Sequence, residues 1–452
     1  MAAKDIRPRI TDAVVVVPGI MGSELVDADG KIRWGLKPSL LANAWVTGNL
    51  EALHVTEADI AGGGRLRPTR LLRDAGYMPL LGGVEPYTYL LGQLTERAVD
   101  SRAVAEFPYD WRLSIAHNAS LLVARCEQHL ADWRRIVAEK RYGDPAEARV
   151  VIVAHSMGGL VTRYAAIELG LAPLLAQIIT LGTPYYGSVK AVQMLATGAG
   201  APPVIPQSAA RGLSLTSPGV HDLLPRYRCW DDGTGIRRIA TADLTRLGAR
   251  GDLADDAQAR WQKLLLDQAA PAVPAPLHAL AGTDQPTRQS VRSAGGSSEF
   301  LDSLAGVDHG GDSTVYRGAA APAGTIALPL PQKHGALART KEAVSIVLDK
   351  LVGADAGPPL GTRELGADIP DLIEAGQPVQ IRATIEDGSP IGVSVTSTAL
   401  DTGVPTTWQT GVAIDGDIVF SRAGLTAGLH RVQVKAGGYS GVSEIMLVVP
   451  RS

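Results

Sequence analysis

The chain has 452 residues, more than one hydrophobic core usually organises, so two domains are expected. A formal net charge of −3 without a basic block argues against a nucleic-acid partner. The two cysteines, Cys126 and Cys229, belong to no C-x-x-C pair or cysteine–histidine cluster, which argues against a metal site. No signal-peptide core and no run of about 18 apolar residues stands out, so a cytoplasmic location is expected.

The first three quarters of the chain alternate short apolar runs with helical patterns. Fully apolar runs are typical of strands buried on both faces of a parallel sheet. A longer apolar stripe from Ile115 to Val137 recurs with a period near 3.6 and predicts a helix that buries Cys126. This alternation favours an α/β fold with a mainly parallel sheet. The expected strands are 14–17, 150–154, 177–181, 276–281 and 324–330, and the expected last helix is 340–351.

The segment 202–266 has little regular pattern: it begins with several prolines and glycines, and helical fragments are expected only later in it. A long irregular insertion in a compact domain is often functional, for example as a lid over an active site. We therefore expect a lid or cap within residues 186–275, which also offers a surface for transient contact with a membrane.

The pattern changes beyond residue 353. A Gly- and Pro-rich linker is expected at 353–362, between a catalytic domain at 1–352 and a second domain at 363–452. In the second domain, stretches such as PVQIRATI and HRVQVK alternate apolar and polar residues, which is typical of strands with one buried face. Short strands at close spacing predict a small immunoglobulin-like β-sandwich. It contains no catalytic cluster, so we expect a packing module or a surface for a protein partner, dispensable for chemistry.

The stretch VVIVAHSMGGL at 150–160 places a serine between an expected strand and an expected helix. At a nucleophile elbow the serine is forced into a strained conformation, and the positions two before and two after it must be small. Ala154 and Gly158 occupy those positions around Ser156, so the pattern departs from G-x-S-x-G by one methyl group. We expect Ser156 to be a nucleophile; the alternative is an ordinary tight turn.

Six short motifs in one order carry a family resemblance. They are PGIMGS at 18–23, YDWR at 109–112, AHSMGGL at 154–160, LGTPYYGS at 181–188, SPGVHDLLP at 217–225 and GDSTV at 311–315. Together they resemble the lecithin:cholesterol acyltransferase-like family of α/β-hydrolases, which includes lipases, phospholipases and acyltransferases. The resemblance does not cover the expected sandwich. It implies an α/β-hydrolase fold with a lid insertion, a lipid or other ester as substrate, and no cofactor.

A nucleophilic serine needs a base and an acid, which follow it in the chain in this fold. His334 follows an apolar strand and precedes the last helix, where the fold places its base, and the resemblance agrees. For the acid two residues stay open: Asp284 directly follows an expected strand, whereas the resemblance selects Asp312 in GDSTV. His155 is expected to pack or hydrogen-bond at the elbow.

The remaining site residues are expected from the elbow and from the resemblance. One backbone N–H of the oxyanion hole should be that of Met157, directly after the serine. The resemblance implies that Met21 supplies the other, and that Ile20, Trp34 and Tyr185 line the substrate site. These residues favour a serine hydrolase that cleaves carboxylic esters of lipids through an acyl-enzyme on Ser156. The alternatives are an acyltransferase with an alcohol acceptor, and an inactive hydrolase scaffold that acts as an interaction protein.

Overall fold

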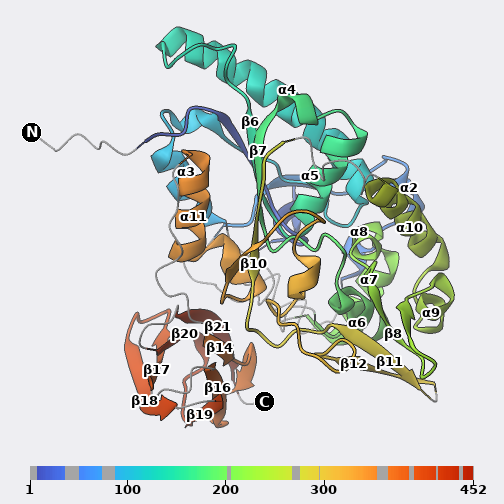
Figure 1. Cartoon of the computed structure of the whole chain (residues 1–452), viewed down its shortest axis with the longest axis vertical. Helices are drawn as coiled ribbons and strands as arrows, with labels where there is room; N and C mark the ends of the chain where they lie inside the picture. Colours follow the sequence, from blue (N-terminus) through green and yellow to red (C-terminus); the bar gives the residue numbers. More distant parts are fainter. Residues whose placement is uncertain are drawn as a thin grey trace, which may run out of the picture.

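A parallel sheet forms the centre of the computed structural model (Figure 1). The structure describes residues 8–35, 50–73, 87–200, 205–266, 275–294, 296–353, 365–385, 391–413, 416–436 and 441–450. Within these ranges the sheet has six strands in the order β13-β10-β7-β6-β1-β5, and every neighbouring pair is parallel. The strands are β1 (Ala13–Val17), β5 (Val104–Glu106), β6 (Val150–His155), β7 (Leu175–Leu181), β10 (Leu277–Gly282) and β13 (Leu328–Leu330).

Helices cover both faces of this sheet, which explains why its inner strands are apolar throughout. Every residue of β1 and β6 is buried. Helices α4 (Ile115–Lys140) and α5 (Met157–Glu168) pack together on one face, and α3 (Thr88–Arg97) and α11 (Lys341–Leu351) lie on the other (Figure 1). The expected strands and helices of this part are confirmed except that the strand expected at 324–330 is limited to β13 and that β5 was not expected. The molecule has the α/β-hydrolase fold.

The long helix α4 confirms the apolar stripe read from the sequence. The Ser114 side chain accepts a hydrogen bond from the His117 N–H at its start, and Arg141 ends it in the left-handed conformation. Cys126 is fully buried in the core, and burial raises the pKa of its thiol to about 12. Cys126 therefore packs as an apolar residue. No helix among the described residues has the length and apolar character that crossing a membrane requires.

A second layer of short elements covers the carboxyl ends of the central strands. Its helices are α6 (Val189–Thr197), α7 (Gln207–Thr216), α8 (Pro218–Asp222), α9 (Thr241–Arg246) and α10 (Gly251–Leu266). Its sheet has the order β12-β11-β8-β9, from β8 (Arg228–Asp231), β9 (Ile236–Arg238), β11 (Ser290–Ala294) and β12 (Ser297–Leu301). The helical fragments expected late in 202–266 are present as α9 and α10. The start of the segment is more regular than expected over its described part: it contains α7 and α8, and β8 pairs with β11 from beyond the segment.

Smaller elements complete the catalytic part of the chain. A three-stranded sheet of described residues follows β1, with β2 as its middle strand. The remaining bounds are β2 (Ser23–Val26), β3 (Ile32–Trp34), β4 (Arg67–Leu71), α2 (Glu57–Ile60), η1 (Glu51–Leu53), η2 (Ser101–Ala103), η3 (Ala172–Leu174), η5 (Arg317–Ala319) and η6 (His334–Ala338).

The C-terminal part is a β-sandwich with its own apolar core. One sheet has the order β14-β16-β19 and the other β15-β21-β20-β17-β18, as far as the chain is described. Ile381, Val395 and Val432, which come from both sheets, are fully buried in that core. Its immunoglobulin-like character stays a prediction, and the expected linker lies outside the described residues except for Gly353. The strands are β14 (Leu365–Asp368), β15 (Leu372–Glu374), β16 (Val379–Ile385), β17 (Ile391–Ala399), β18 (Pro405–Ala413), β19 (Gly416–Arg422), β20 (Gly428–Ala436) and β21 (Val442–Val449).

Candidate active site

Ser156 lies at the junction of β6 and α5, where the backbone turns sharply. Its φ of 51° and ψ of −125° are unusual for a residue other than glycine, and such a conformation costs about 1–3 kcal/mol. The turn is crowded: a Cβ added at Gly158 would lie 2.5 Å from the carbonyl oxygen of Pro18. Ala154, two residues before the serine, is fully buried. The small residues are therefore required by close packing, as at a nucleophile elbow.

The structure brings Ser156, His334 and Asp312 together in one hydrogen-bonded chain. The Ser156 Oγ lies 2.8 Å from His334 Nε2, and His334 Nδ1 lies 2.7 Å from Asp312 Oδ2. Because an ionised carboxylate only accepts hydrogen bonds, Nδ1 carries the proton in this arrangement and Nε2 is free to accept from the serine hydroxyl. All three residues are buried, with Asp312 fully so.

Backbone groups hold the Asp312 carboxylate in place. Its Oδ1 accepts hydrogen bonds from the N–H groups of Thr314 at 3.0 Å and Val315 at 2.6 Å. The backbone N–H of His334 donates to the Asp312 carbonyl at 2.7 Å, so the two residues are joined twice. The sequence alternative Asp284 lies elsewhere: it is half-buried, and its carboxylate accepts a hydrogen bond from the Thr283 hydroxyl. The carboxylate beside the imidazole is that of Asp312.

Two backbone N–H groups near the serine are not used within the fold. Neither the Met157 N–H, at the start of α5, nor the Met21 N–H donates a hydrogen bond to a described residue. Met21 has a positive φ of 62°, and its carbonyl accepts a hydrogen bond from Trp34 Nε1 at 2.8 Å. Trp34 thus holds the peptide group that follows Met21, next to the one that carries the Met21 N–H. This arrangement leaves two donors for a developing negative charge.

A small, mainly apolar hollow of about 80 Å³ lies directly beside Ser156. Ile20 lines it, with residues of α6 and α8 from the covering layer. Trp34 and Tyr185, two expected substrate contacts, do not line it. Trp34 packs edge-on against Trp111, and Tyr185 is buried with its hydroxyl bonded to Thr180. Both rings serve packing, because their polar atoms are already satisfied inside the protein.

One cation faces the hollow. Lys190 Nζ donates a hydrogen bond to Thr314 Oγ1 at 3.1 Å, beside the Asp312 turn. Burial lowers the pKa of Lys190, whereas the nearby carboxylates of Asp371 and Asp312 oppose that shift. No sequence pattern singled out this lysine, since it follows the motif LGTPYYGS without belonging to it.

His155 links the two sides of the site without touching the nucleophile's hydroxyl. Its Nδ1 lies 2.9 Å from the Tyr87 hydroxyl, and its Nε2 lies 3.1 Å from the His334 carbonyl oxygen. Burial, and then the neighbouring His334, lower the pKa of His155 to about 3, so its ring is neutral. The carbonyl only accepts, so Nε2 carries the proton and Nδ1 accepts from Tyr87.

Tyr87 extends this network to the loop that carries Met21. Its hydroxyl oxygen accepts a hydrogen bond from the Gly19 N–H at 2.8 Å. A directed chain of hydrogen bonds therefore runs from the loop that carries Met21 through Tyr87 and His155 to the backbone of His334. The expected hydrogen-bonding role of His155 at the elbow is confirmed. Tyr87 was missed, because in the sequence it is only the first residue of a helical stripe.

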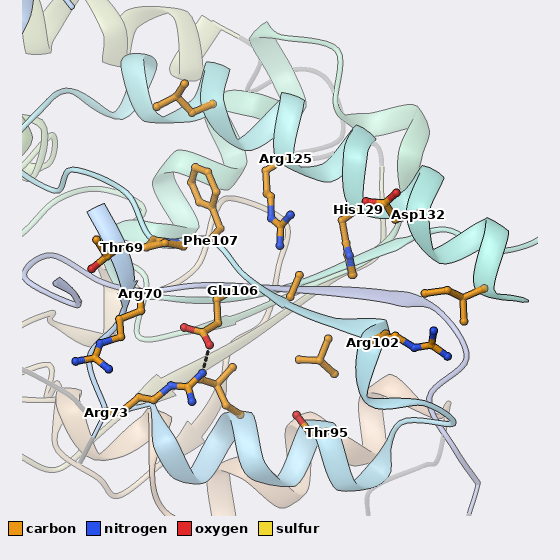
Figure 2. A pocket seen from close by; sticks show the side chains of 16 residues that line it. Thr69, Arg70, Arg73, Thr95, Arg102, Glu106, Phe107, Arg125, His129 and Asp132 are labelled. Atoms are coloured by element: carbon orange, nitrogen blue, oxygen red, sulfur yellow. Dashed lines mark hydrogen bonds and ion pairs between the residues drawn. The ribbon is translucent and has the colours of Figure 1, made fainter. Parts of the chain in front are cut away.

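A larger hollow, of about 950 Å³, lies at the edge of the sheet beside β5 (Figure 2). Side chains of α4 and the end of β4 line it, and Arg73 forms an ion pair with Glu106 on its floor (Figure 2). Its one buried imidazole, among the described residues, is His129, which hydrogen-bonds to the Ala103 carbonyl. Among the described residues, the hydrogen bond of that ring goes to a backbone carbonyl and not to a hydroxyl or thiol.

No group of three or more His, Cys, Asp or Glu residues that could hold a metal ion occurs in the described ranges. The sequence model of the lecithin:cholesterol acyltransferase family matches residues 77–241. This match confirms the resemblance and spans four of its six motifs, including the one around Ser156. Met21, Asp312 and His334 lie outside the matched range, so their roles rest on geometry.

Solved structures show distant similarity. One is the structure described as the Tle4–Tli4 complex, with 16% identity over 75% of this chain and 96% of that chain, and a TM-score of 0.47. Another is the lipase BlEst2 of Bacillus licheniformis in its propeptide form, with 13% identity over 98% of this chain and 94% of that chain, and a TM-score of 0.32. No curated protein matches the chain. These similarities are too distant to transfer a substrate or a partner.

Proposed function

We propose that this protein is a serine hydrolase that cleaves carboxylic esters of lipids through an acyl-enzyme on Ser156. The α/β-hydrolase fold and the family resemblance are those of lipid esterases and acyltransferases. The observation that carries the finer proposal is the continuous chain from the strained Ser156 through His334 to the buried Asp312 carboxylate.

In the proposed mechanism, His334 Nε2 takes the proton of the Ser156 hydroxyl while Oγ attacks the ester carbonyl carbon. The negative charge that develops on the carbonyl oxygen is stabilised by the N–H groups of Met21 and Met157. His334 then gives its proton to the leaving alcohol as the carbon–oxygen bond breaks. Water, activated by the same imidazole, hydrolyses the acyl-enzyme. Asp312 keeps the ring in one tautomer and stabilises its positive charge.

The walls of the hollow support an apolar acyl group as the part of the substrate next to Ser156. Ile20, Ala191, Met194 and Val220 line it with few polar groups. At about 80 Å³ it is smaller than the roughly 300–1,000 Å³ of ordinary ligand sites. Because α6 and α8 form part of its wall, we propose that this covering layer is a lid that moves to admit a lipid. In this proposal, the lid is also the part of the protein that contacts a lipid surface.

A fluorophosphonate probe tests the proposal most directly, because it reacts covalently with an activated serine. We expect labelling of the wild type and none of Ser156→Ala, with hydrolysis of a soluble ester reduced about 10⁶-fold. Ser120→Ala, which changes an exposed serine of α4, is the matched control and should label normally. Equal labelling of Ser156→Ala and the wild type contradicts the mechanism.

The same assay distinguishes transfer from hydrolysis. Adding a primary alcohol at increasing concentration and separating free acid from new ester shows which acceptor the acyl-enzyme prefers. Release of free acid as the main product supports the hydrolase proposal, whereas new ester as the main product makes the protein an acyltransferase. If the fluorophosphonate does not label the wild type, the remaining alternative is an inactive hydrolase scaffold that acts as an interaction protein.

A further inference from the structure

The C-terminal sandwich contacts the loop that carries His334. This loop follows β13 and includes η6, which begins at His334 itself. In the view of Figure 1, the sandwich lies below α11. Its hydrogen bonds to this loop come from the residue directly after β14, from the residue directly before β21, and from β21 itself.

The two residues before His334 are both bonded to the sandwich. Gln332 is almost fully buried, and its Nε2 donates a hydrogen bond to the Gly441 carbonyl at 3.0 Å. Lys333 Nζ donates to the Ile369 carbonyl at 2.9 Å and lies 3.9 Å from the Asp371 carboxylate. The backbone directly before the imidazole is thus anchored at two successive side chains.

A third contact follows His334 along the chain. Arg339 Nη2 lies 3.3 Å from Glu444 Oε2, and the Glu444 side chain is only 6% exposed. A buried carboxylate needs such a partner, because an uncompensated buried charge is strongly destabilising. Leu447, three residues further along β21, packs against the core of the catalytic part. Polar and apolar contacts therefore fix the same strand to the catalytic part.

The catalytic part alone holds His334 through few groups. Its ring contacts Ser156 and Asp312, and its backbone bonds to Asp312 and His155. Proton transfer requires the imidazole within hydrogen-bond reach of both neighbours. A displacement of about 1 Å can cost about 10²-fold in rate. Anchoring of the loop on both sides of the imidazole limits such displacement.

We infer that the C-terminal sandwich is a positioning element for the base: it holds the loop 332–339 so that the His334 imidazole stays between Ser156 and Asp312. The inference rests on the proposed function and adds to it a role for residues 365–450. It replaces the expectation from the sequence that the sandwich is dispensable for chemistry. Lys333 and Arg339 act as positioning residues through this contact, and Gln332 acts with them.

The test uses the full chain and changes a residue of the sandwich. Glu444→Leu removes the carboxylate that pairs with Arg339, and we expect kcat on a soluble ester to fall about 10- to 100-fold with KM unchanged. Glu444→Gln should restore most of the activity, because its amide oxygen still accepts a hydrogen bond. The rate of Ser156 modification by the fluorophosphonate should fall and recover in parallel with kcat.

Asp417→Leu is the matched control. It breaks the Arg382–Asp417 ion pair on an exposed part of the sandwich, with side chains 58% and 42% exposed. It should leave kcat unchanged. If Glu444→Leu does not fold, Lys333→Met gives the second measurement, with the same fall in kcat expected. A folded Glu444→Leu or Lys333→Met protein with wild-type kcat overturns the inference. Because Ser156→Ala tests the nucleophile separately, failure of the inference and failure of the proposed function give different results.

Discussion

The proposed nucleophile and the proposed base reach their positions in different ways. Ser156 lies in a strand, a sharp turn and a helix that are continuous in the chain, and its backbone is also bonded to Leu181 and Thr183 beside that strand. His334 follows Ser156 by 178 residues and lies on a loop that is bonded to Asp312, His155 and the sandwich. The sequence pattern of the proposed nucleophile is therefore local, whereas the position of the proposed base shows no such pattern and depends on contacts that are distant in the chain.

Among the changes that test this contrast, the largest loss of activity is expected for Asp312, whose carboxylate holds the imidazole of His334. Asp312→Asn keeps the shape of the side chain but no longer fixes the tautomer or the charge of His334. We expect kcat to fall roughly 10³–10⁴-fold. Asp284→Asn is the matched substitution at the residue that sequence order also allowed, and it should cost at most about tenfold. Both are measured with one soluble ester, and the reverse ranking would transfer the role to Asp284.

The same contrast explains how much of the site could be predicted from the sequence. The elbow was found because its requirements, apolar strand, small residues and helix, lie within one stretch of chain. Sequence order allows both Asp284, which follows a strand, and Asp312, which the resemblance selects; only the fold shows which carboxylate meets the imidazole. Tyr87 and Lys190 were missed because their partners, Gly19 and Thr314, are far away in the chain.

The fold was predicted unevenly for a related reason. Buried strands such as β6 and the long helix α4 have a strong pattern, because burial constrains every residue of one face or both. The strands of the covering layer were not predicted, because short strands that pair across the chain leave no local pattern: β8 lies between β9 and β11. In the sandwich, the alternation in β16 and β20 was clear, but β18, rich in threonine, was not expected. The contacts between the sandwich and the loop 332–339 correspond to no recognisable pattern in the sequence of either segment.

A smaller effect is expected from the covering layer, because it lies over the proposed nucleophile and the proposed base alike and would restrict access to both. If the segment 202–266, described from 205 on, acts as a lid, an apolar interface should stabilise its open state. We expect the rate on a short-chain ester to rise several-fold when the substrate exceeds its solubility limit and aggregates. Plain saturation below that limit, without a further rise above it, would contradict a lid. A fully water-soluble ester, which forms no interface, serves as the control.

The smallest expected effect is on stability and concerns His155, which is next to Ser156 in the chain and hydrogen-bonds to the backbone of His334. Burial and then His334 lower its pKa to about 3 from the ordinary 6.5. Between these pH values the unfolded chain binds a proton that the folded protein does not. The free energy of unfolding contributed by this ring should therefore be fully present above pH 6.5 and fall as the pH decreases towards about 3.

His155→Gln removes the titrating ring but keeps an amide that can still donate and accept hydrogen bonds. We expect this variant to be less stable than the wild type near neutral pH, because the amide fits the Tyr87–His334 gap less well. We also expect its Tm to fall less steeply as the pH drops below 6.5, since one source of proton uptake on unfolding is gone. Thermal unfolding followed by circular dichroism at a series of pH values measures both.

His309→Gln makes the same substitution at an exposed histidine and should leave the wild-type curve unchanged. Parallel Tm curves for the wild type and His155→Gln would show that His155 is not held neutral between Tyr87 and His334.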